Sequence, residues 1–296
     1  MNNLKLLIIV LVLALTLIIV SSRNTTFFDN ETYINVLDNE GIKKKELEEY
    51  VLGVVAGEMP ASFEMEALKA QAVASRTYAA YKLEKSNKDY DVLADISDQV
   101  YIDEAKMQEK WGNDFKKYYD KIKMAVDATK GLVLKYNDAV IKAYYFSMSN
   151  GYTEDVSLVF NEERNYLESV ESIYDNEELK NFSVTTSFTK EEFLKKLGLS
   201  GKEVVIGKIE RSKTNRVNKI VINNEEFIGT NFRKLLNLRS TDFDISVVEE
   251  LVVITTRGYG HGVGMSQYGA NGMAKNGSSY IDILKHYYKN IEITDL

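Results

Sequence analysis

The sequence of 296 residues predicts a mixed α+β fold, and three observations lead to this prediction. Apolar residues recur at helical spacing after Lys45. Two short runs with alternating polarity, at 204–210 and 217–222, follow one another as antiparallel strands do. Hydrophobic residues make up 45% of the chain, which is enough for a sizeable core. The alternation of helices and strands would also suit an α/β fold, but short paired strands favour antiparallel pairing.

The chain begins with the pattern of a membrane-targeting segment. Residues 6–20 are apolar except for Thr16, and Lys5 precedes them. This length fits an uncleaved membrane helix or a cleaved signal, and the anchor is favoured because no Ala-x-Ala site follows. We expect residues 1–23 to be the membrane anchor or signal segment and residues 24–44 to be a linker, with the rest outside the membrane.

Two helices are predicted next. From about Lys45 the apolar residues lie on one helical face, and Gly57 is expected to end that helix. After Pro60, the only proline, Ser62 is the expected N-cap of a long helix that runs to about Lys85. Residues of the first apolar face are Leu47, Tyr50, Val51, Val54 and Val55.

The remaining elements follow from the same patterns. Residues 86–111 look irregular. Helices are predicted at 112–130, 190–197, 231–238 and 278–288, and strands at 132–136, 139–146, 204–210, 217–222 and 251–255. After position 175 the sequence pattern changes to short helices and alternating strands. This change predicts a smaller β-rich inserted α+β subdomain at 175–245 and a helix-rich part formed by 45–174 and 246–296. A groove is expected between the two.

Composition excludes several classes of function. The formal charge of −7 argues against nucleic acid as a partner, whereas an uncharged polysaccharide is compatible with it. The chain has no cysteine, which excludes disulfides, thiolate catalysis and cysteine-based metal sites. The two histidines, His261 and His286, are too few for a site built from several imidazoles.

Glu58 is the first candidate for chemistry. It continues the apolar face of the first helix by one more step, so its carboxyl is expected to lose hydration and to have a raised pKa. Helix carbonyls nearby act in the same direction. A carboxyl that stays protonated near neutral pH can protonate a glycosidic oxygen. The spacing alone is equally compatible with a helix-end glutamate that is exposed to water.

Two further features are compatible with function or with structure alone. Arg76 is surrounded on its helix by small residues, so it could orient a carboxylate, or its stem could simply reach solvent. The segment 258–269 holds five glycines and suggests a strained loop or a close approach to a ligand. His261 within it could contact a substrate or could be a structural loop residue.

With these residues in view, the chain resembles the stage II sporulation protein D family of lytic transglycosylases. The similarity runs from about Leu47 to the C-terminus, and its motifs occur in order. They are Gly57-Glu58-Met59-Pro60 and the runs 67–78, 99–101, 149–154, 166–170, 232–241 and 260–270.

The resemblance implies that Glu58 is the catalytic acid. It implies cleavage between N-acetylmuramic acid and N-acetylglucosamine, with a 1,6-anhydro ring as product, in strands whose stem peptides have been removed. The setting implied is engulfment during sporulation, at the mother-cell membrane. The partners implied are stage II sporulation protein P, an amidase, and stage II sporulation protein M, a membrane scaffold. Since some amidase enhancers share this domain type, a non-catalytic glycan-binding activator of an amidase is the alternative.

Other residues match positions that we expect along the glycan groove: Arg76, Gln99, Tyr166, His261, Ser266, Gln267 and Tyr268. Two departures from the family pattern matter. Ile96, Ser97 and Asp98 stand where some relatives carry zinc-binding Cys and His, so we expect no metal and no cofactor. Glu168 stands where a basic residue is common, which places the glycan contact near Tyr166 in doubt.

Overall fold

The computed structural model describes residues 32–296, so the predicted membrane segment lies outside the described residues. From Ile34 to Leu296 the chain forms one compact unit. Within the described part, no helix combines the length and the apolar character needed to cross a membrane.

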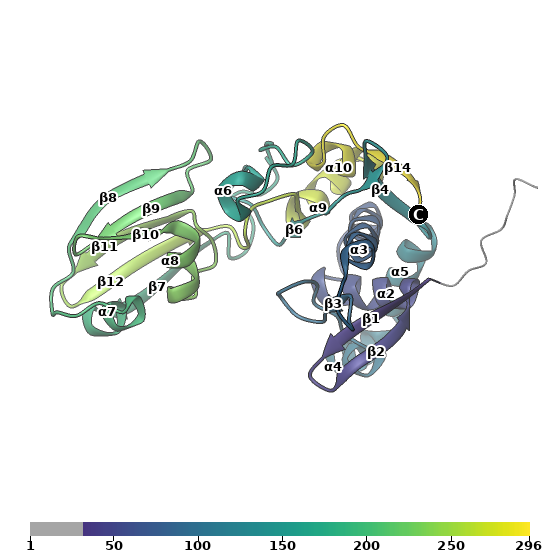
Figure 1. Ribbon diagram of the computed structural model, residues 1–296, viewed down its shortest axis with the longest axis horizontal. Coiled ribbons are helices and arrows are strands. Elements are labelled where there is room, and N and C mark those ends of the chain that lie inside the picture. The colour runs from purple at the N-terminus through teal and green to yellow at the C-terminus, as the bar shows by residue number, and fades with distance from the viewer. Residues whose placement is uncertain (1–31) are drawn as a thin grey trace, which may run out of the picture. The chain divides into compact units, whose positions relative to one another are not determined.

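Helices and short strands alternate along the described chain, which confirms the α+β prediction (Figure 1). The helices are α2 (Leu47–Glu58), α3 (Met65–Lys85), α4 (Glu104–Trp111), η1 (Gly112–Asp114), α5 (Phe115–Asp127), α6 (Val156–Phe160), α7 (Lys190–Leu197), α8 (Gly229–Leu236), α9 (Gln267–Lys275) and α10 (Tyr280–Tyr287). The strands are β1 (Tyr33–Asp38), β2 (Gly41–Glu46), β3 (Val92–Leu93), β4 (Leu132–Tyr136), β5 (Ala139–Val140), β6 (Tyr145–Phe146), β7 (Ser183–Thr189), β8 (Ile206–Arg211), β9 (Val217–Ile222), β10 (Glu225–Ile228), β11 (Phe243–Val248), β12 (Leu251–Arg257), β13 (Met265–Ser266) and β14 (Glu292–Asp295).

The strands form several small sheets rather than one large one. Their orders are β2-β1-β3, β10-β9-β8, β11-β12-β7, β13-β6 and β14-β4-β5. The predicted pairing of 204–210 with 217–222 is confirmed, because β8 and β9 are antiparallel neighbours. The short β6–β13 pair is parallel and joins Tyr145 to Met265 across a long stretch of chain.

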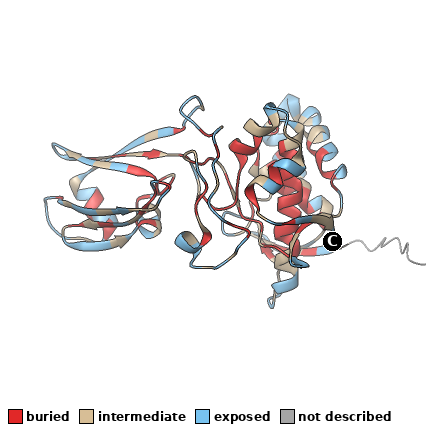
Figure 2. Cartoon of the chain, turned by 90° about the horizontal axis from the view of Figure 1, so that it is seen from above, coloured by how far each residue is buried: buried red, intermediate tan, exposed pale blue. Residues whose placement is uncertain are grey.

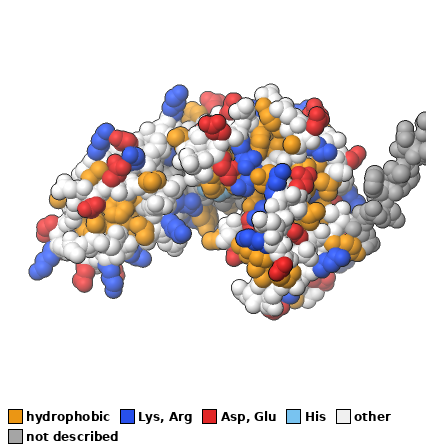
Figure 3. Space-filling model, in the orientation of Figure 1, with side chains coloured by type: hydrophobic (Ala, Val, Ile, Leu, Met, Phe, Trp, Pro, Cys, Tyr) orange, Lys and Arg blue, Asp and Glu red, His pale blue; other side chains and the backbone are white. Residues whose placement is uncertain are grey.

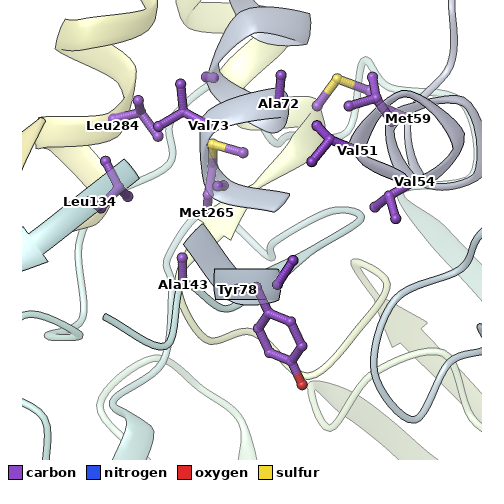
Figure 4. Close-up of a cluster of buried hydrophobic side chains, with 14 of the residues drawn as sticks. Val51, Val54, Met59, Ala72, Val73, Tyr78, Leu134, Ala143, Met265 and Leu284 are labelled. Carbon is purple, nitrogen blue, oxygen red and sulfur yellow. The ribbon is translucent and has the colours of Figure 1, made fainter. Parts of the chain in front are cut away.

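The larger hydrophobic core surrounds α3. Alanines at 67, 70, 72, 74 and 79 are buried, and their small side chains let α2, α5, α9 and α10 pack closely on this helix (Figures 1 and 2). Figure 4 shows Ala72 and Val73 among side chains from other elements, including Val51 of α2 and Leu284 of α10. The predicted apolar face of α2 is confirmed, since all five of its residues are buried.

A second hydrophobic core lies in the segment that contains β7–β12. Its buried residues run from Phe193 to Ile254, and Phe232 of α8 stacks on Phe243 of β11 with ring centroids 5.3 Å apart. Both cores belong to the single compact unit, so the predicted boundaries at 175 and 245 stay predictions.

Positive and negative side chains are interspersed over the face of the molecule in Figure 3.

A buried polar network connects this segment to the loop after β6. Ser212 and Thr214 both donate hydrogen bonds to Oε2 of Glu154 at 2.5 Å. The guanidinium of Arg216 donates to the Tyr152 carbonyl at 3.0 Å. Asn150 donates to Asp242 at 2.8 Å. These hydrogen bonds connect the two parts of the chain and give Glu154 and Arg216 polar partners, while Oδ1 of Asn150 is buried without one.

Several local predictions were wrong. Gly57 lies within α2, which ends at Glu58, and the single strand expected at 139–146 is divided into β5 and β6. Of the linker expected at 24–44, residues 33–38 form β1 and residues 41–44 belong to β2, because Ile34 and Val36 are buried against the core. Part of the supposedly irregular segment forms α4, whose N-cap Asp103 accepts a hydrogen bond from the Lys106 amide. Helix α3 begins at Met65 with Glu64 as N-cap, so Ser62 does not cap it.

Candidate functional site

Glu58 is the last residue of α2, and a neighbouring segment of backbone lies against that end of the helix. A Cβ on Gly57 would lie 2.3 Å from the Val100 carbonyl oxygen, and one on Gly53 would lie 2.2 Å from the Tyr101 ring. These two glycines, one helical turn apart, therefore let residues 100–102 pack directly on α2. The close approach brings the Val100 amide to 2.7 Å from Oε1 of Glu58, and this amide donates a hydrogen bond.

Burial dominates the electrostatics of Glu58. It raises the pKa of the carboxyl from its usual 4.5 to about 7, while hydrogen bonds from the Val100 amide and the Gln267 side chain, and the charge of Lys110, act in the opposite direction. Lys110 itself donates to the Ala56 carbonyl at 2.8 Å. At neutral pH the carboxyl is therefore protonated in a substantial fraction of molecules and can donate a proton.

The β6–β13 pair brings two further side chains to Glu58. Tyr145 lies on β6, and Gln267 follows β13 as the first residue of α9. The two strands approach closely because Gly264 has no side chain: a Cβ there would lie 2.0 Å from the Tyr144 carbonyl oxygen, and its φ is +78°. The charge of Glu58 contributes to raising the pKa of Tyr145, after burial, which keeps the Tyr145 hydroxyl protonated.

Gln99 orients Tyr145 through a hydrogen bond to its hydroxyl. Its side-chain amide donates to the Tyr145 hydroxyl at 2.9 Å and to the Ser75 carbonyl at 3.2 Å, and its carbonyl accepts from Tyr50 at 3.2 Å. Because Gln99 is fully buried, this network is fixed by the core. With the Gln99 amide as donor, the Tyr145 hydroxyl keeps its own proton available.

Glu58 opens onto a cleft of about 1230 Å³. One part of its lining comes from α3 and the segment after it, and another comes from α8, the loop that follows α8, and the glycine-rich loop before β13. The polar and aromatic residues of the lining include Tyr78, Lys82, Asp98, Lys142, Tyr144, Tyr145, Phe160, Glu162, Arg233, Asn237, Arg239, Tyr259, His261 and Gln267.

Three other carboxylates line the cleft: Asp91 accepts a hydrogen bond from the Asn35 amide at 2.7 Å, and the other two are paired with cations. Asp98 accepts hydrogen bonds from Tyr78 and Lys82, each at 2.8 Å. Glu162 is paired with Lys142 at 3.1 Å and with Arg164 at 2.5 Å, and these contacts lower its pKa against the effect of burial. Glu58 differs from both, because its environment favours the protonated form.

Of the residues predicted to line a groove, His261 and Gln267 lie in the cleft. The His261 ring packs against Tyr144, Phe146 and Phe160, and its Nδ1 accepts a hydrogen bond from the Val263 amide at 3.1 Å. Burial lowers the pKa of His261 to about 3, and the nearby charges of Arg233 and Arg216 act in the same direction. His261 is therefore a neutral imidazole at physiological pH.

Arg76 does not lie in the cleft. Its side chain is fully buried and donates to both carboxylate oxygens of Glu48, at 2.8 and 2.5 Å. A third hydrogen bond goes to the Leu132 carbonyl at 3.1 Å. The direct glycan contact predicted for Arg76 is corrected accordingly: the structure gives its guanidinium internal partners and no surface for a ligand.

The other predicted residues lie near the site and do not line the cleft. Gln99 reaches the cleft only through Tyr145. Ser266 is buried, donates to Asp175 at 2.6 Å and caps α9. Tyr268 packs edge-on against Phe63, with centroids 4.9 Å apart. Tyr166 is buried and its hydroxyl accepts from the Lys142 amide at 3.1 Å. These contacts indicate that all four residues position neighbouring parts of the site.

Tyr145 and the arginines of the α8 region were missed by the sequence reasoning as site residues. Tyr145 lies in a run that reads only as a strand, and nothing local relates it to Glu58. Arg233 and Arg239 lie within a motif, at 232–241, that was noted without a role. The sequence places them six positions apart around the end of a helix, but nothing in that spacing relates them to Glu58.

Comparisons with known proteins identify the family of this chain. The family described as "Stage II sporulation protein" matches residues 38–136. Stage II sporulation protein D of Bacillus subtilis (strain 168) is 42% identical over 266 residues, covering 87% of this chain and 77% of the relative. Its counterpart in Bacillus amyloliquefaciens is 40% identical over 264 residues, covering 87% and 76%.

A more distant relative is the amidase enhancer of Bacillus subtilis (strain 168). It is 30% identical over 297 residues, covering 82% of this chain but 40% of the relative. The two sporulation proteins are similar over most of their own length and of this chain. The chain therefore belongs to the stage II sporulation protein D family.

Proposed function

We propose that this protein is a peptidoglycan lytic transglycosylase, which cleaves the bond between N-acetylmuramic acid and N-acetylglucosamine in strands without stem peptides. The observation that carries the proposal is the carboxyl of Glu58, which lines the cleft and has a pKa raised by burial to about 7. At neutral pH such an acid is protonated in a substantial fraction of molecules and is still strong enough to transfer its proton.

Glu58 would act twice in one turnover. It first protonates the glycosidic oxygen, the bond from C1 of N-acetylmuramic acid breaks, and positive charge develops at C1. The Glu58 carboxylate then removes the proton from the C6 hydroxyl, whose oxygen bonds to C1 and closes the 1,6-anhydro ring. The carboxyl is protonated again at the end, so no water is consumed. Pairing of Asp98 and Glu162 with bases fits a site with a single working carboxylic acid.

Residues around Glu58 have complementary roles in this proposal. The hydrogen bonds from the Val100 amide and Gln267 stabilise the carboxylate that forms when the proton has been donated. Tyr145, held by Gln99, can donate a hydrogen bond to the sugar or to the departing oxygen. Tyr144 and Phe160 stack with centroids 4.5 Å apart and provide an apolar face suited to a sugar ring.

Cleavage products test the reaction. Full-length protein, kept in solution with a mild detergent, is incubated with stem-peptide-free glycan strands and the products are analysed by mass spectrometry. We expect 1,6-anhydro ends from the wild type and a loss of roughly 10²- to 10⁴-fold in Glu58→Gln, the range that general acid catalysis contributes. Glu84→Gln should cause no change, because Glu84 is exposed on α3 and lies outside the cleft lining. Reducing ends would instead identify a hydrolase, and unchanged cleavage by Glu58→Gln would rule out this acid.

A second function is favoured by one observation, the similarity to an amidase enhancer. In that case the chain would bind glycan and activate an amidase without cutting the strand itself. The same incubation separates the two, because an activator co-sediments with the strands, leaves them intact, and increases peptide release when an amidase is added.

The biological setting is proposed with the activity. The protein would be held by its N-terminal segment on the mother-cell membrane, with the cleft facing the engulfment space. Stage II sporulation protein P, an amidase, would remove stem peptides before this enzyme cuts, and stage II sporulation protein M would hold both in place. Co-purification of the three from membranes of sporulating cells tests the assembly, and its absence after mild crosslinking would count against it.

A further inference from the structure

Two arginines of the cleft stand out by the partners they have. Arg233 lies near the end of α8, and Arg239 follows in the loop before β11. Both line the cleft together with Asn237 and Tyr259. Nε of Arg233 donates to the Leu238 carbonyl at 3.1 Å, which fixes the loop between them.

Within residues 32–296, the guanidinium of Arg239 makes one hydrogen bond. Its guanidinium lies over the Tyr259 ring, 4.1 Å from the centroid, and one terminal nitrogen reaches the Asn181 carbonyl at 3.4 Å. Its Nε is buried and has no hydrogen-bond partner. Because Nε is enclosed by protein, the terminal nitrogens of the Arg239 guanidinium are the donors that a ligand in the cleft can reach.

Neither arginine has a carboxylate partner within ion-pair distance among residues 32–296. Three cations in or beside the cleft differ in this respect: Lys82 is paired with Asp98, and both Lys142 and Arg164 are paired with Glu162. On the strands beside α8, Arg211 and Arg257 are both paired with Asp244. Burial lowers the pKa of Arg233, as expected of a cation with little water around it and no opposing charge.

A carboxylate is the ligand that such a pair fits. Guanidinium groups are planar and bind carboxylates through two parallel hydrogen bonds. In the proposed substrate, every N-acetylmuramic acid carries a lactyl group. Its carboxyl is an uncharged amide while a stem peptide is attached and becomes a free carboxylate when an amidase removes the peptide.

We propose that Arg233 and Arg239 bind the free lactyl carboxylate of N-acetylmuramic acid and thereby select strands from which the stem peptide has been removed. The inference rests on the glycan-cleaving function proposed above. It makes the amidase reaction the step that creates the charge this cleft recognises, in addition to removing the bulk of the peptide.

Two ligands that differ only in this charge test the proposal. One is a muramic-acid-containing tetrasaccharide with free lactyl carboxylates, and the other is the same tetrasaccharide with lactyl carboxamides. Binding to the full-length chain in detergent is measured by calorimetry in the Glu58→Gln background, so that no ligand is cleaved. The variants are Arg233→Gln and Arg239→Gln, with Lys234→Gln as the matched control, because Lys234 is exposed on the same helix and lies outside the cleft lining.

We expect the carboxylate ligand to bind roughly tenfold to a hundredfold more tightly than the carboxamide, as a charge-assisted hydrogen bond provides. Each arginine variant should lose most of this difference while binding the carboxamide as before, and Lys234→Gln should retain it. Equal affinity for the two ligands in the parent protein would overturn the proposal, as would a preference that survives in both arginine variants.

These results are independent of the cleavage test. If the chain prefers the carboxylate ligand but cuts no strand, the carboxylate site stands and the transglycosylase function fails. If it cuts strands but binds both ligands equally, the function stands and the arginines have another role. Should an arginine variant fold poorly, the comparison of the two ligands on the parent protein still decides.

Discussion

Glu58 combines two properties that oppose each other in most carboxylates. Its burial disfavours the charge, while two hydrogen bonds and Lys110 keep that charge attainable. The balance leaves the pKa near 7, where loss and recovery of a proton cost similar free energies. A side chain tuned in this way reduces the stability of the folded protein whenever it is ionised.

Replacing Glu58 with glutamine should therefore stabilise the protein at alkaline pH. The carboxyl binds its proton more tightly in the folded state (pKa about 7) than in the unfolded state (4.5), so folding stability decreases as pH rises from 4.5 to 7. The loss is at most about 3 kcal/mol, since one pKa unit corresponds to about 1.4 kcal/mol. Thermal unfolding at pH 8 should show Glu58→Gln several degrees above the wild type.

The same comparison at pH 4 is the control, because both proteins then carry a neutral group at this position. A melting temperature of Glu58→Gln that equals the wild type at both pH values would show that the carboxyl is well hydrated, contrary to the structure.

The end of α2 depends on contacts that only glycine permits. Gly57 is helical and faces the Val100 carbonyl, so the segment 100–102 can rest on the helix. A larger side chain at position 57 would push the segment 100–102 away from α2, and the hydrogen bond from the Val100 amide to Glu58 would be lost. The element therefore positions the acid through backbone rather than through side-chain packing.

Gly57→Ala should lower the cleavage rate without unfolding the protein. Alanine favours the helix by about 1 kcal/mol, but its Cβ would lie 2.3 Å from the Val100 oxygen, so the segment must move. A displacement near 1 Å can reduce a rate by about a hundredfold, and we expect at least tenfold here. Turnover of glycan strands measures the rate, and sedimentation with the strands checks that binding persists.

An unchanged rate in Gly57→Ala, together with a far-UV spectrum like that of the wild type, would mean that the Val100 contact does not position Glu58.

At the scale of the whole molecule, one buried ion pair joins elements that are distant in sequence. Arg76 of α3 binds Glu48 of α2, and its other donors reach the carbonyls of Val126 in α5 and Leu132 in β4. The Gly131 amide also donates to Glu48, at 3.1 Å. The contacts of this pair tie together the core on which the cleft is built.

Glu48→Ala should destabilise the fold by about 3–5 kcal/mol, because it leaves a buried guanidinium without its counter-charge. Glu49→Ala is the matched control: Glu49 is one position away, its side chain is 62% exposed, and it pairs only with surface Lys45. That variant should change stability by about 0.5 kcal/mol or less. Urea unfolding followed by fluorescence measures both, and equal stabilities of the two variants would contradict a structural role for Arg76.

How far the sequence predicts this molecule depends on how local each feature is. The face of α2 follows from spacing within one helix, and the raised pKa predicted for Glu58 from the same spacing agrees with the burial found there. For Arg76 the small neighbours allowed a carboxylate partner but did not identify it, because Glu48 lies 28 residues away. Tyr145 was missed because the parallel β6–β13 pair that places it depends on long-range register.

The donor that faces Glu58 from the 100–102 segment belongs to the main chain, and this restricts how the acid can be retuned. Every residue type at position 100 except proline supplies the same N–H, so ordinary substitutions there leave the proton affinity of the acid nearly unchanged. A shift of the working pH has to come from the two adjustable neighbours, Gln267 and Lys110. Relatives adapted to more acidic or more alkaline surroundings should therefore differ at those two positions.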